Sequence, residues 1–389
     1  MKIVADANIP LVEEAFDGLG DVVCVDGRTI DRAVVESAEI LLVRSVTKVN
    51  RELLEGTSVK FVATATIGLD HVDTEFLKGN NIGFASAPGS NANSVAEYVT
   101  SAIVHLAHDR EIRTEQLVLG IIGVGNVGSR MLRMGQALGM ECLLNDPPKK
   151  RLTGSDSFLP LERVLAEADV VTVHVPLNSA GRDATYRMVD EAFIAKMKEG
   201  AILINTSRGG VVDERHLRAH HKHLGGIVLD VWENEPTINM DTVAVADIAT
   251  PHIAGYSYDG KLTGSQMVYD AACAFFFAEP RWSIEPYLQR EQANRIDLSQ
   301  SPDPVFDAIA GAYPIFRDTR GMNNLVELEK DKRAERFDVL RKEYPKRLEF
   351  RHHPLEGGDT DPHILLKLRD LGFRAPEHEV AQKKKKNKS

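Results

Sequence analysis

The sequence has few cysteines and no long apolar run. Its three cysteines, Cys24, Cys142 and Cys273, lie far apart and form no CxxC pair, so neither a disulfide framework nor a zinc site is expected. No apolar segment approaches the ~20 residues that a membrane span needs, and the N-terminal "MKIVADANIP" lacks the regions of a signal peptide. These absences predict a cytoplasmic protein with no membrane partner.

The sequence also lacks an excess of positive charge, with 47 Lys and Arg against 57 Asp and Glu. The formal net charge is −10, whereas a general nucleic-acid-binding protein needs a basic face to neutralise phosphates. We therefore expect no nucleic-acid partner. The basic run "KKKKNKS" at 383–389 is interpreted as part of a solvated, disordered tail over residues 381–389. The histidine run at 220–223 is interpreted as an exposed helix face, so no metal is expected.

Alternation of short β-branched runs with helical patterns continues almost to residue 275. This rhythm is typical of βαβ units and parallel sheets. One set of strands is predicted at 2–6, 39–44, 60–65 and 82–86, and a second at 117–122, 141–146, 169–175, 201–206, 226–231 and 247–251.

Two long helical patterns, from about residue 93 and from about residue 258, indicate that the chain leaves the first domain and later returns to it. After residue 285 the rhythm changes, and the predicted helices 331–344 and 360–373 indicate a small module without an evident catalytic constellation. The predicted fold class is α/β, with two doubly wound parallel-sheet (Rossmann-like) domains plus a small C-terminal α+β dimerisation domain. The predicted boundaries are 1–95 with 260–285 for a discontinuous substrate-binding domain, 96–259 for an NAD-binding Rossmann domain, and 286–380 for the C-terminal domain.

A glycine fingerprint, Gly123-x-Gly125-x-x-Gly128, follows one predicted strand and opens a helix. Such glycines permit a tight turn and close approach of the backbone to a pyrophosphate, and the helix N-terminus favours the anion. Asp146 ends the next predicted strand, where its carboxylate would accept hydrogen bonds from ribose hydroxyls and repel a 2′-phosphate. The pattern therefore predicts NAD rather than NADP, with a glycine turn that binds no ligand as the alternative.

Arg208 follows the predicted strand 201–206 in the stretch "INTSRGG". Ligands of open α/β sheets bind beyond the carboxyl ends of the strands, and an arginine fork there suits a substrate carboxylate and a neighbouring carbonyl oxygen. The alternative is an ion-pairing arginine on the surface.

His252, in "TPHIAGYS", follows the predicted strand 247–251. An imidazole titrates near neutrality, so it can exchange a hydroxyl proton while hydride leaves the same carbon. A carboxylate on its other ring nitrogen would orient the ring. Glu235 in "DVWENEP" is the candidate, and the pattern leaves Glu233 open as an alternative.

Arg44 and Ser45 follow a predicted strand of the first domain. A cation and a hydroxyl at a strand end can hold a phosphate. Arg44 could also serve a substrate carboxylate, or simply pair with an acidic neighbour.

Five ordered stretches, "GIIGVGNVGSRM", "ADVVTVHVPLN", "LINTSRGGVVDE", "LDVWENEP" and "TPHIAGYS", resemble the D-isomer-specific 2-hydroxyacid dehydrogenase family. The resemblance implies that Arg208 binds and polarises a 2-hydroxy or 2-oxo acid, that His252 is the proton donor or acceptor, and that Glu235 pairs with it. It also places Asp230 at the nicotinamide end of NAD. The candidate cofactor-binding residues are Gly123, Gly125, Asn126, Val127, Gly128, Asp146, Val175, Thr206, Ser207, Asp230 and Gly255.

Further stretches, including "MKIVADANIP", "VRSVTKVN", "VATATIGLDHVD" and "APGSNANSVAEYV", are similar to members of that family that act on a small phosphorylated 2-hydroxy acid and form homodimers through an additional C-terminal domain. That likeness implies that Ser45, Thr66 and Tyr256 contact the substrate, with Arg44 as a further candidate. Two alternatives stay open: a dehydrogenase of another 2-hydroxy acid, such as 3-phosphoglycerate, and an NAD-sensing binding protein of the corepressor type.

Overall fold

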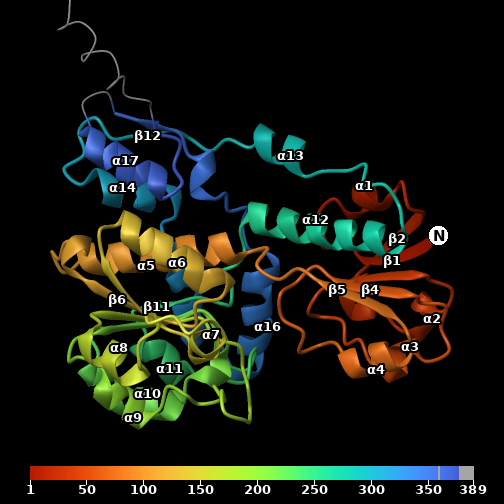
Figure 1. Cartoon of the computed structure of the whole chain (residues 1–389), viewed down its shortest axis with the longest axis horizontal. Coiled ribbons are helices and arrows are strands. Elements are labelled where there is room, and N and C mark those ends of the chain that lie inside the picture. The colour runs from red at the N-terminus through yellow and green to blue at the C-terminus, as the bar shows by residue number, and fades with distance from the viewer. Residues whose placement is uncertain (358–359, 376–389) are drawn as a thin grey trace, which may run out of the picture. The chain divides into compact units, whose positions relative to one another are not determined.

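The computed structural model describes residues 1–357 and 360–375, and it contains two wholly parallel sheets flanked by helices (Figure 1). A short parallel pair of strands follows in the C-terminal part. The predicted α/β class, with two parallel Rossmann-like sheets and a small C-terminal part, is thereby confirmed. The predicted tail at 381–389 lies outside the described residues, and none of the described helices is long and apolar enough to cross a membrane.

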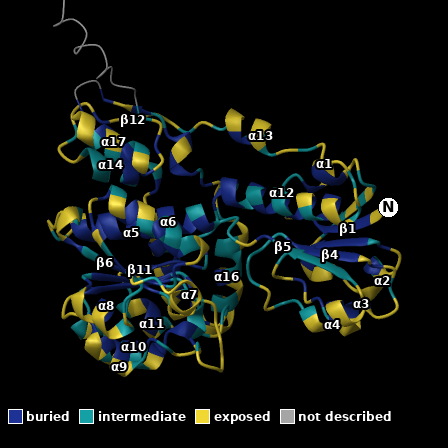
Figure 2. Cartoon of the chain, viewed as in Figure 1, coloured by how far each residue is buried: buried dark blue, intermediate teal, exposed yellow. Residues whose placement is uncertain are grey.

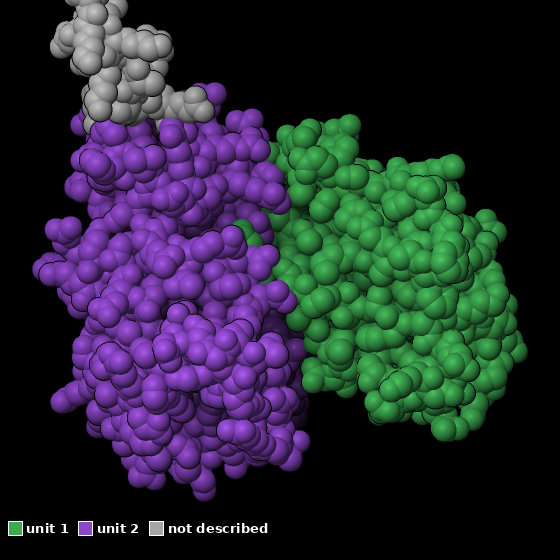
Figure 3. All heavy atoms as spheres, in the orientation of Figure 1, with its two compact units in different colours: residues 1–94, 256–291 green, residues 95–255, 292–389 purple. Residues whose placement is uncertain are grey.

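The described residues form two compact units (Figure 3). The first comprises Met1–Ser94 and Tyr256–Glu291, and the second comprises Val95–Gly255 together with the chain from Gln292 onward. The chain thus leaves the first unit and returns to it within a few residues of the predicted positions. The C-terminal segment, which we expected as a separate domain, packs with the second unit.

The first unit is built on a five-stranded sheet in the order β2-β1-β3-β4-β5. Consecutive strand residues point to opposite faces, and here both faces are covered. Ile3 and Leu42 pack against α1 and α12, whereas Val4 and Leu41 pack against α3 and α4. The strands and helices of this unit are β1 (Lys2–Asp6), α1 (Val12–Phe16), β2 (Asp21–Val25), α2 (Arg32–Val35), β3 (Ile40–Val43), α3 (Arg51–Leu54), β4 (Phe61–Thr64), α4 (Thr74–Gly79), β5 (Gly83–Ser86), α12 (Tyr258–Phe275) and α13 (Glu285–Arg290).

The second unit is built on a six-stranded sheet in the order β11-β10-β9-β8-β6-β7. All its strands except the edge strand β7 are almost fully buried (Figure 2), as expected for a parallel sheet with helices on both faces. The elements are α5 (Ala92–His108), β6 (Val118–Ile122), α6 (Asn126–Ala137), β7 (Glu141–Asn145), α7 (Pro147–Thr153), α8 (Leu161–Glu167), β8 (Val170–Val173), α9 (Glu191–Lys196), β9 (Ile202–Asn205), α10 (Glu214–His220), β10 (Gly226–Leu229), α11 (Met240–Val245) and β11 (Ile248–Ala249).

The C-terminal segment contributes directly to the core of the second unit. Met322, Leu325 and Phe337 are fully buried in the same cluster as Trp232 and Ala249. Its elements are β12 (Ile296–Asp297), α14 (Pro304–Ala312), α15 (Phe316–Asn323), α16 (Lys330–Lys342), β13 (Leu355–Glu356) and α17 (Pro362–Asp370). Removing this segment would therefore expose apolar surface of the second sheet's own core.

Candidate functional site

The glycine loop lies at the point where the strand order of the second sheet reverses, between β6 and β8. Gly123 has a positive φ of 85°, and a Cβ there would lie 2.4 Å from the carbonyl oxygen of His174. A Cβ on Gly128 would lie 2.1 Å from the carbonyl oxygen of Gly123. Both positions therefore require glycine.

Gly125 differs from these two glycines because a Cβ there would meet no atom within 4 Å. It immediately precedes α6, whose first backbone N–H groups have no partner inside the helix. Loop and helix end together fit the pyrophosphate of a dinucleotide. Asn126 and Val127 form the first turn of that helix, and Val175 lies against Gly123.

Asp146 is held beside the glycine loop. Its carboxylate accepts hydrogen bonds from the backbone N–H of Val124 and of Lys149, each 2.9 Å long, and so caps the N-terminus of α7. The side chain of Lys149 in turn donates to the carbonyl of Val124. A carboxylate fixed at this place fits the ribose hydroxyls of NAD.

Two candidate hydroxyls follow β9, and the structure distinguishes them. Ser207 is buried, and its N–H and Oγ both bond to Oδ1 of Asn205 at 3.0 and 2.7 Å. The Oγ1 of Thr206 is buried and makes no hydrogen bond with the described residues. Because a buried hydroxyl without a partner is costly, Thr206 fits a polar group of a bound cofactor better than Ser207 does.

Glu235 and His252 form a direct pair in which Oε2 of Glu235 lies 2.8 Å from Nδ1 of His252. Oε1 of Glu235 accepts the backbone N–H of Trp232, also at 2.8 Å. Burial alone would raise the pKa of Glu235, but the charge and hydrogen bond of His252 and the N–H of Trp232 lower it below its ordinary value. Glu235 is therefore a carboxylate that fixes the ring and leaves Nε2 as the reactive nitrogen.

Glu233, the other candidate for this role, has different partners. Its carboxylate lies 3.3 Å from Arg187, and its backbone N–H donates to Glu214 at 2.6 Å. Glu235, and not Glu233, therefore pairs with His252. Neither Arg187 nor Glu214 was identified from the sequence, because nothing in their local pattern relates them to residue 233.

The loop that carries His252 is anchored by Asp230, which is 1% exposed. Its carboxylate accepts the backbone N–H groups of Ile253 (2.7 Å) and Ala254 (3.0 Å), and the hydroxyl of Thr250 (2.7 Å). Burial raises the pKa of Asp230 to about 6, although the charge of His252 and these three hydrogen bonds act in the opposite direction. Asp230 lies at the predicted nicotinamide end, and its carboxylate holds the loop that carries His252. Gly255, another cofactor candidate, directly follows this anchored stretch.

We expect acidification to weaken this anchor. As the pH falls through about 6, Asp230 gains a proton and one carboxyl oxygen stops being a good acceptor, so turnover should fall. The folded-state pKa is raised, so for this group alone stability moves the other way: the unfolding free energy rises by about 3 kcal/mol as the pH falls from above 6 to below 4. Measuring turnover and urea unfolding between pH 4.5 and 8, with Asp230→Asn as the control, checks both signs. Identical pH profiles for the two proteins would contradict the prediction.

Arg208 follows β9, whereas Asp230 follows β10 and His252 lies just beyond β11. These strands are neighbours and parallel, so their carboxyl ends share one edge of the sheet. The turn after Arg208 also touches the Glu235 loop, since a Cβ on Gly209 would lie 1.9 Å from the carbonyl oxygen of Trp232. Nη1 of Arg208 donates to the backbone carbonyl of Ser207 at 2.8 Å. The predicted catalytic residues are thus brought to one edge.

In the first unit, Arg44 follows β3 at the reversal point of that sheet, next to the end of β1. Its Nε lies 3.5 Å from the fully buried carboxylate of Asp6, and Nη1 donates to the carbonyl of Asn8 at 3.3 Å. The ion-pair alternative for Arg44 is therefore realised. Pairing does not remove the residue from a ligand, because a guanidinium has five donors.

The other substrate candidates also lie in the first unit. Ser45 is exposed beside Arg44. The hydroxyl of Thr66 lies 2.7 Å from that of Thr64, which also contacts Nε2 of His71 at 3.0 Å. Burial lowers the pKa of His71, so this contact involves a neutral ring. Tyr256 is half-buried, with Nζ of Lys261 4.8 Å from its ring centre. His71 was missed from the sequence.

The histidine run at 220–223 differs from the expected exposed face. His221 and His223 are half-buried and bond through ring nitrogens to the carbonyl oxygens of Arg218 (2.8 Å) and Met197 (2.9 Å). The cause is that α10 ends at His220, so the run turns back onto the protein. Within the described residues, no group of three or more His, Cys, Asp or Glu side chains could hold a metal ion.

Residues 92–254 match the family model described as D-isomer specific 2-hydroxyacid dehydrogenase, NAD binding domain. An erythronate-4-phosphate dehydrogenase of Salinibacter ruber is 44% identical, covering 92% of this chain and 94% of that protein. The enzyme of that name from Cronobacter sakazakii is 40% identical, covering 98% of this chain and 100% of that protein.

A solved structure of D-lactate dehydrogenase from Aquifex aeolicus, complexed with NAD and lactic acid, is 27% identical with a TM-score of 0.59. The match covers 95% of that chain but 71% of this one, so more than a quarter of this protein has no counterpart there. The chain belongs to the D-isomer-specific 2-hydroxyacid dehydrogenases and, within them, to the erythronate-4-phosphate dehydrogenase family.

Proposed function

We propose that the protein oxidises 4-phospho-D-erythronate at C2 to (R)-3-hydroxy-2-oxo-4-phosphooxybutanoate with NAD, as a step of pyridoxine 5′-phosphate (vitamin B6) biosynthesis. The reaction type rests on the 2.8 Å pair between Glu235 and His252 at the sheet edge that also carries Arg208. The substrate rests on relatives of that name that are 38–44% identical over at least 90% of the chain.

Three residues of the second unit, Arg208, His252 and Glu235, have separate roles in this reaction. Arg208 presents a permanently charged fork that suits the substrate carboxylate and polarises the oxygen on C2. His252 takes the proton of the C2 hydroxyl on Nε2, since Nδ1 faces Glu235. The Glu235 carboxylate stabilises the resulting imidazolium. NAD, when bound, accepts the hydride from C2.

Substrate selectivity is the first test. NADH formation is followed with erythronate 4-phosphate, 3-phosphoglycerate, unphosphorylated erythronate and lactate at equal concentrations. We expect the highest kcat/KM for erythronate 4-phosphate. Turnover of another acid alone would reject the substrate, and NAD binding without turnover of any acid would favour the corepressor-type alternative.

Arg44 provides a second test, because we propose that it holds the substrate phosphate with Ser45. Arg44→Gln should raise KM for erythronate 4-phosphate about 10- to 100-fold, the worth of one hydrogen bond to a charged group, while unphosphorylated erythronate is little affected. Equal losses for both acids would instead assign Arg44 to the carboxylate. Asp6→Asn is the matched control, since it breaks the same ion pair but keeps the guanidinium.

We also propose that the enzyme works as a cytoplasmic homodimer assembled through the C-terminal segment. The free thiols Cys24, Cys142 and Cys273 suit a reducing compartment. Two large apolar side chains of the described part of this segment are exposed, Val326 (58%) and Leu366 (52%). Sedimentation of the full chain and of the double variant Val326→Asp, Leu366→Asp tests this assembly.

A further inference from the structure

The loop after β11 is held from two directions. On one side, Asp230 just after β10 accepts the N–H groups of Ile253 and Ala254. From the C-terminal segment, Nη2 of Arg347 donates to the carbonyl of Ala254 at 2.6 Å. The peptide groups that follow His252 are therefore fixed through both their donors and an acceptor.

His252 needs such support. Its φ of 57° lies in the left-handed region, which non-glycine residues rarely adopt. Such backbone conformations cost roughly 1–3 kcal/mol and persist where the surroundings determine them strongly. The geometry that aims the imidazole thus depends on contacts outside the histidine itself.

The side chain of Arg347 is buried and held in place by its neighbours. It is 8% exposed, and its guanidinium carbon lies 4.6 Å from the ring centre of Tyr313. The carbonyl of Tyr313 accepts the hydroxyl of Ser101 at 3.0 Å, and Glu97 accepts the N–H of Phe350 at 3.0 Å. Helix α5, which carries Ser101 and Glu97, therefore anchors the segment on both sides of the arginine contact.

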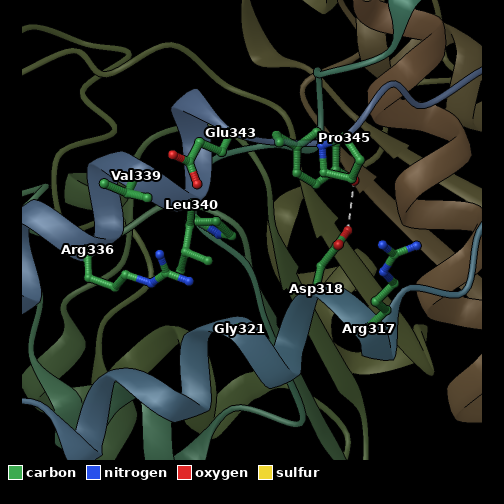
Figure 4. A pocket seen from close by; sticks show the side chains of 10 residues that line it. Arg317, Asp318, Gly321, Arg336, Val339, Leu340, Glu343 and Pro345 are labelled. Atoms are coloured by element: carbon green, nitrogen blue, oxygen red, sulfur yellow. Dashed lines mark hydrogen bonds between the residues drawn. The ribbon is translucent and has the colours of Figure 1, made fainter.

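The residue before the histidine meets the same segment. Pro251 lines a cavity of about 190 Å³ together with Gly321 of α15 and Leu340 of α16. Figure 4 shows the two helices facing each other across this space. The hydroxyl of Tyr344 donates to Oδ2 of Asp318 at 2.8 Å. The C-terminal segment therefore reaches both sides of His252 in the sequence.

We propose that Arg347 is a positioning residue for catalysis, which fixes the carbonyl of Ala254 and thereby the backbone turn that directs the imidazole of His252. This inference rests on the proposed role of His252 as the proton acceptor. It gives the C-terminal segment a task within its own chain, separate from any role in assembly. A buried cation is costly. If Arg347 served only to pack the segment against the second unit, an apolar residue could fill the same space at a lower cost.

The test compares Arg347→Met, Arg347→Lys and the control Arg320→Met, an exposed arginine of the same segment. Arg347→Met should lower kcat about 10- to 100-fold, since small misplacements of a catalytic group have effects of this size. NAD affinity should stay within about twofold of the wild type, because Arg347 holds the loop after β11, whereas the glycine loop follows β6. Arg347→Lys, which keeps a donor, should recover part of kcat, and Arg320→Met should resemble the wild type.

The pH profile separates positioning from plain stabilisation. In Arg347→Met the acidic limb of the kcat profile should shift, because that limb includes the titration of Asp230, which holds the same loop, and amide exchange at 252–255 should become faster. If this variant does not fold, Arg347→Lys carries the test through kcat and amide exchange. Unchanged kcat and pH profile, or equal losses of kcat and NAD affinity, would overturn the proposal. An inactive wild type would instead reject the proposed function.

Discussion

His252→Asn should retain NAD binding and lose about 10²- to 10⁴-fold in kcat, the usual contribution of a general acid–base group. Asparagine is the appropriate replacement because it tolerates the left-handed conformation, with φ of 57°, that this position adopts. Alanine would add backbone strain to the loss of the imidazole, so its effect could not be attributed to proton transfer. The measurement is steady-state NADH formation with erythronate 4-phosphate at several pH values.

NAD binding and stability make this experiment specific. Loss of the imidazole should lower kcat while NAD affinity and the free energy of unfolding stay close to the wild type, whereas a damaged fold would lower all three. His363→Asn, on the exposed face of α17, is the matched control and should behave as the wild type. A His252→Asn protein with more than a tenth of wild-type kcat would contradict the role assigned to the ring.

Arg208→Lys should lose about 10²-fold in kcat/KM and Arg208→Ala about 10³-fold or more. Lysine keeps the charge but replaces the planar fork with a single point of contact, and loss of a charge-assisted bidentate pair typically costs several kcal/mol. The loss in Arg208→Ala should appear in both KM and kcat, because the roles proposed for the guanidinium are to bind the carboxylate and to polarise the oxygen on C2.

A substrate analogue separates the two contributions of Arg208. Oxalate, which carries the carboxylate and an adjacent oxygen but cannot react, should inhibit the wild type and bind much more weakly to Arg208→Ala. Thermal melting should change little, since the side chain is only half-buried. If oxalate binds both proteins equally, Arg208 does not contact the carboxylate, and the surface ion-pair interpretation would be preferred.

The sequence predicts most of the fold because a parallel sheet buried on both faces consists of nearly continuous apolar runs. Ten strands of the two sheets were located in this way. β2 was missed, because "DVVCV" forms an edge strand whose side chains are only partly buried and whose apolar signal is short. The C-terminal segment was predicted as a separate domain, since the pattern does not reveal that Phe337 joins the core of another sheet.

The candidate site shows the same division between local and distant information. Arg208, Asp230 and His252 follow predicted strands, so the strand-end rule located them. The partners that decide their behaviour come from elsewhere in the chain. Asp6, which pairs with Arg44, lies 38 residues before it in the sequence, and Arg347 lies 93 residues after Ala254. Such contacts follow from tertiary packing, and a single sequence does not encode them in any spacing.

The hydrogen bonds from two backbone N–H groups to Asp230 affect which substitutions the protein tolerates. Every residue type except proline offers the same N–H group, so the two hydrogen bonds to Asp230 do not themselves select the residues at 253 and 254. Packing does select them, because Ile253 and Ala254 are 0% and 1% exposed. The acceptor has no such freedom, because asparagine would lose the charge and glutamate would be too long for the fully enclosed space. We therefore anticipate a saturation library in which residue 230 is nearly invariant, whereas positions 253 and 254 accept those apolar side chains that fit the same buried space.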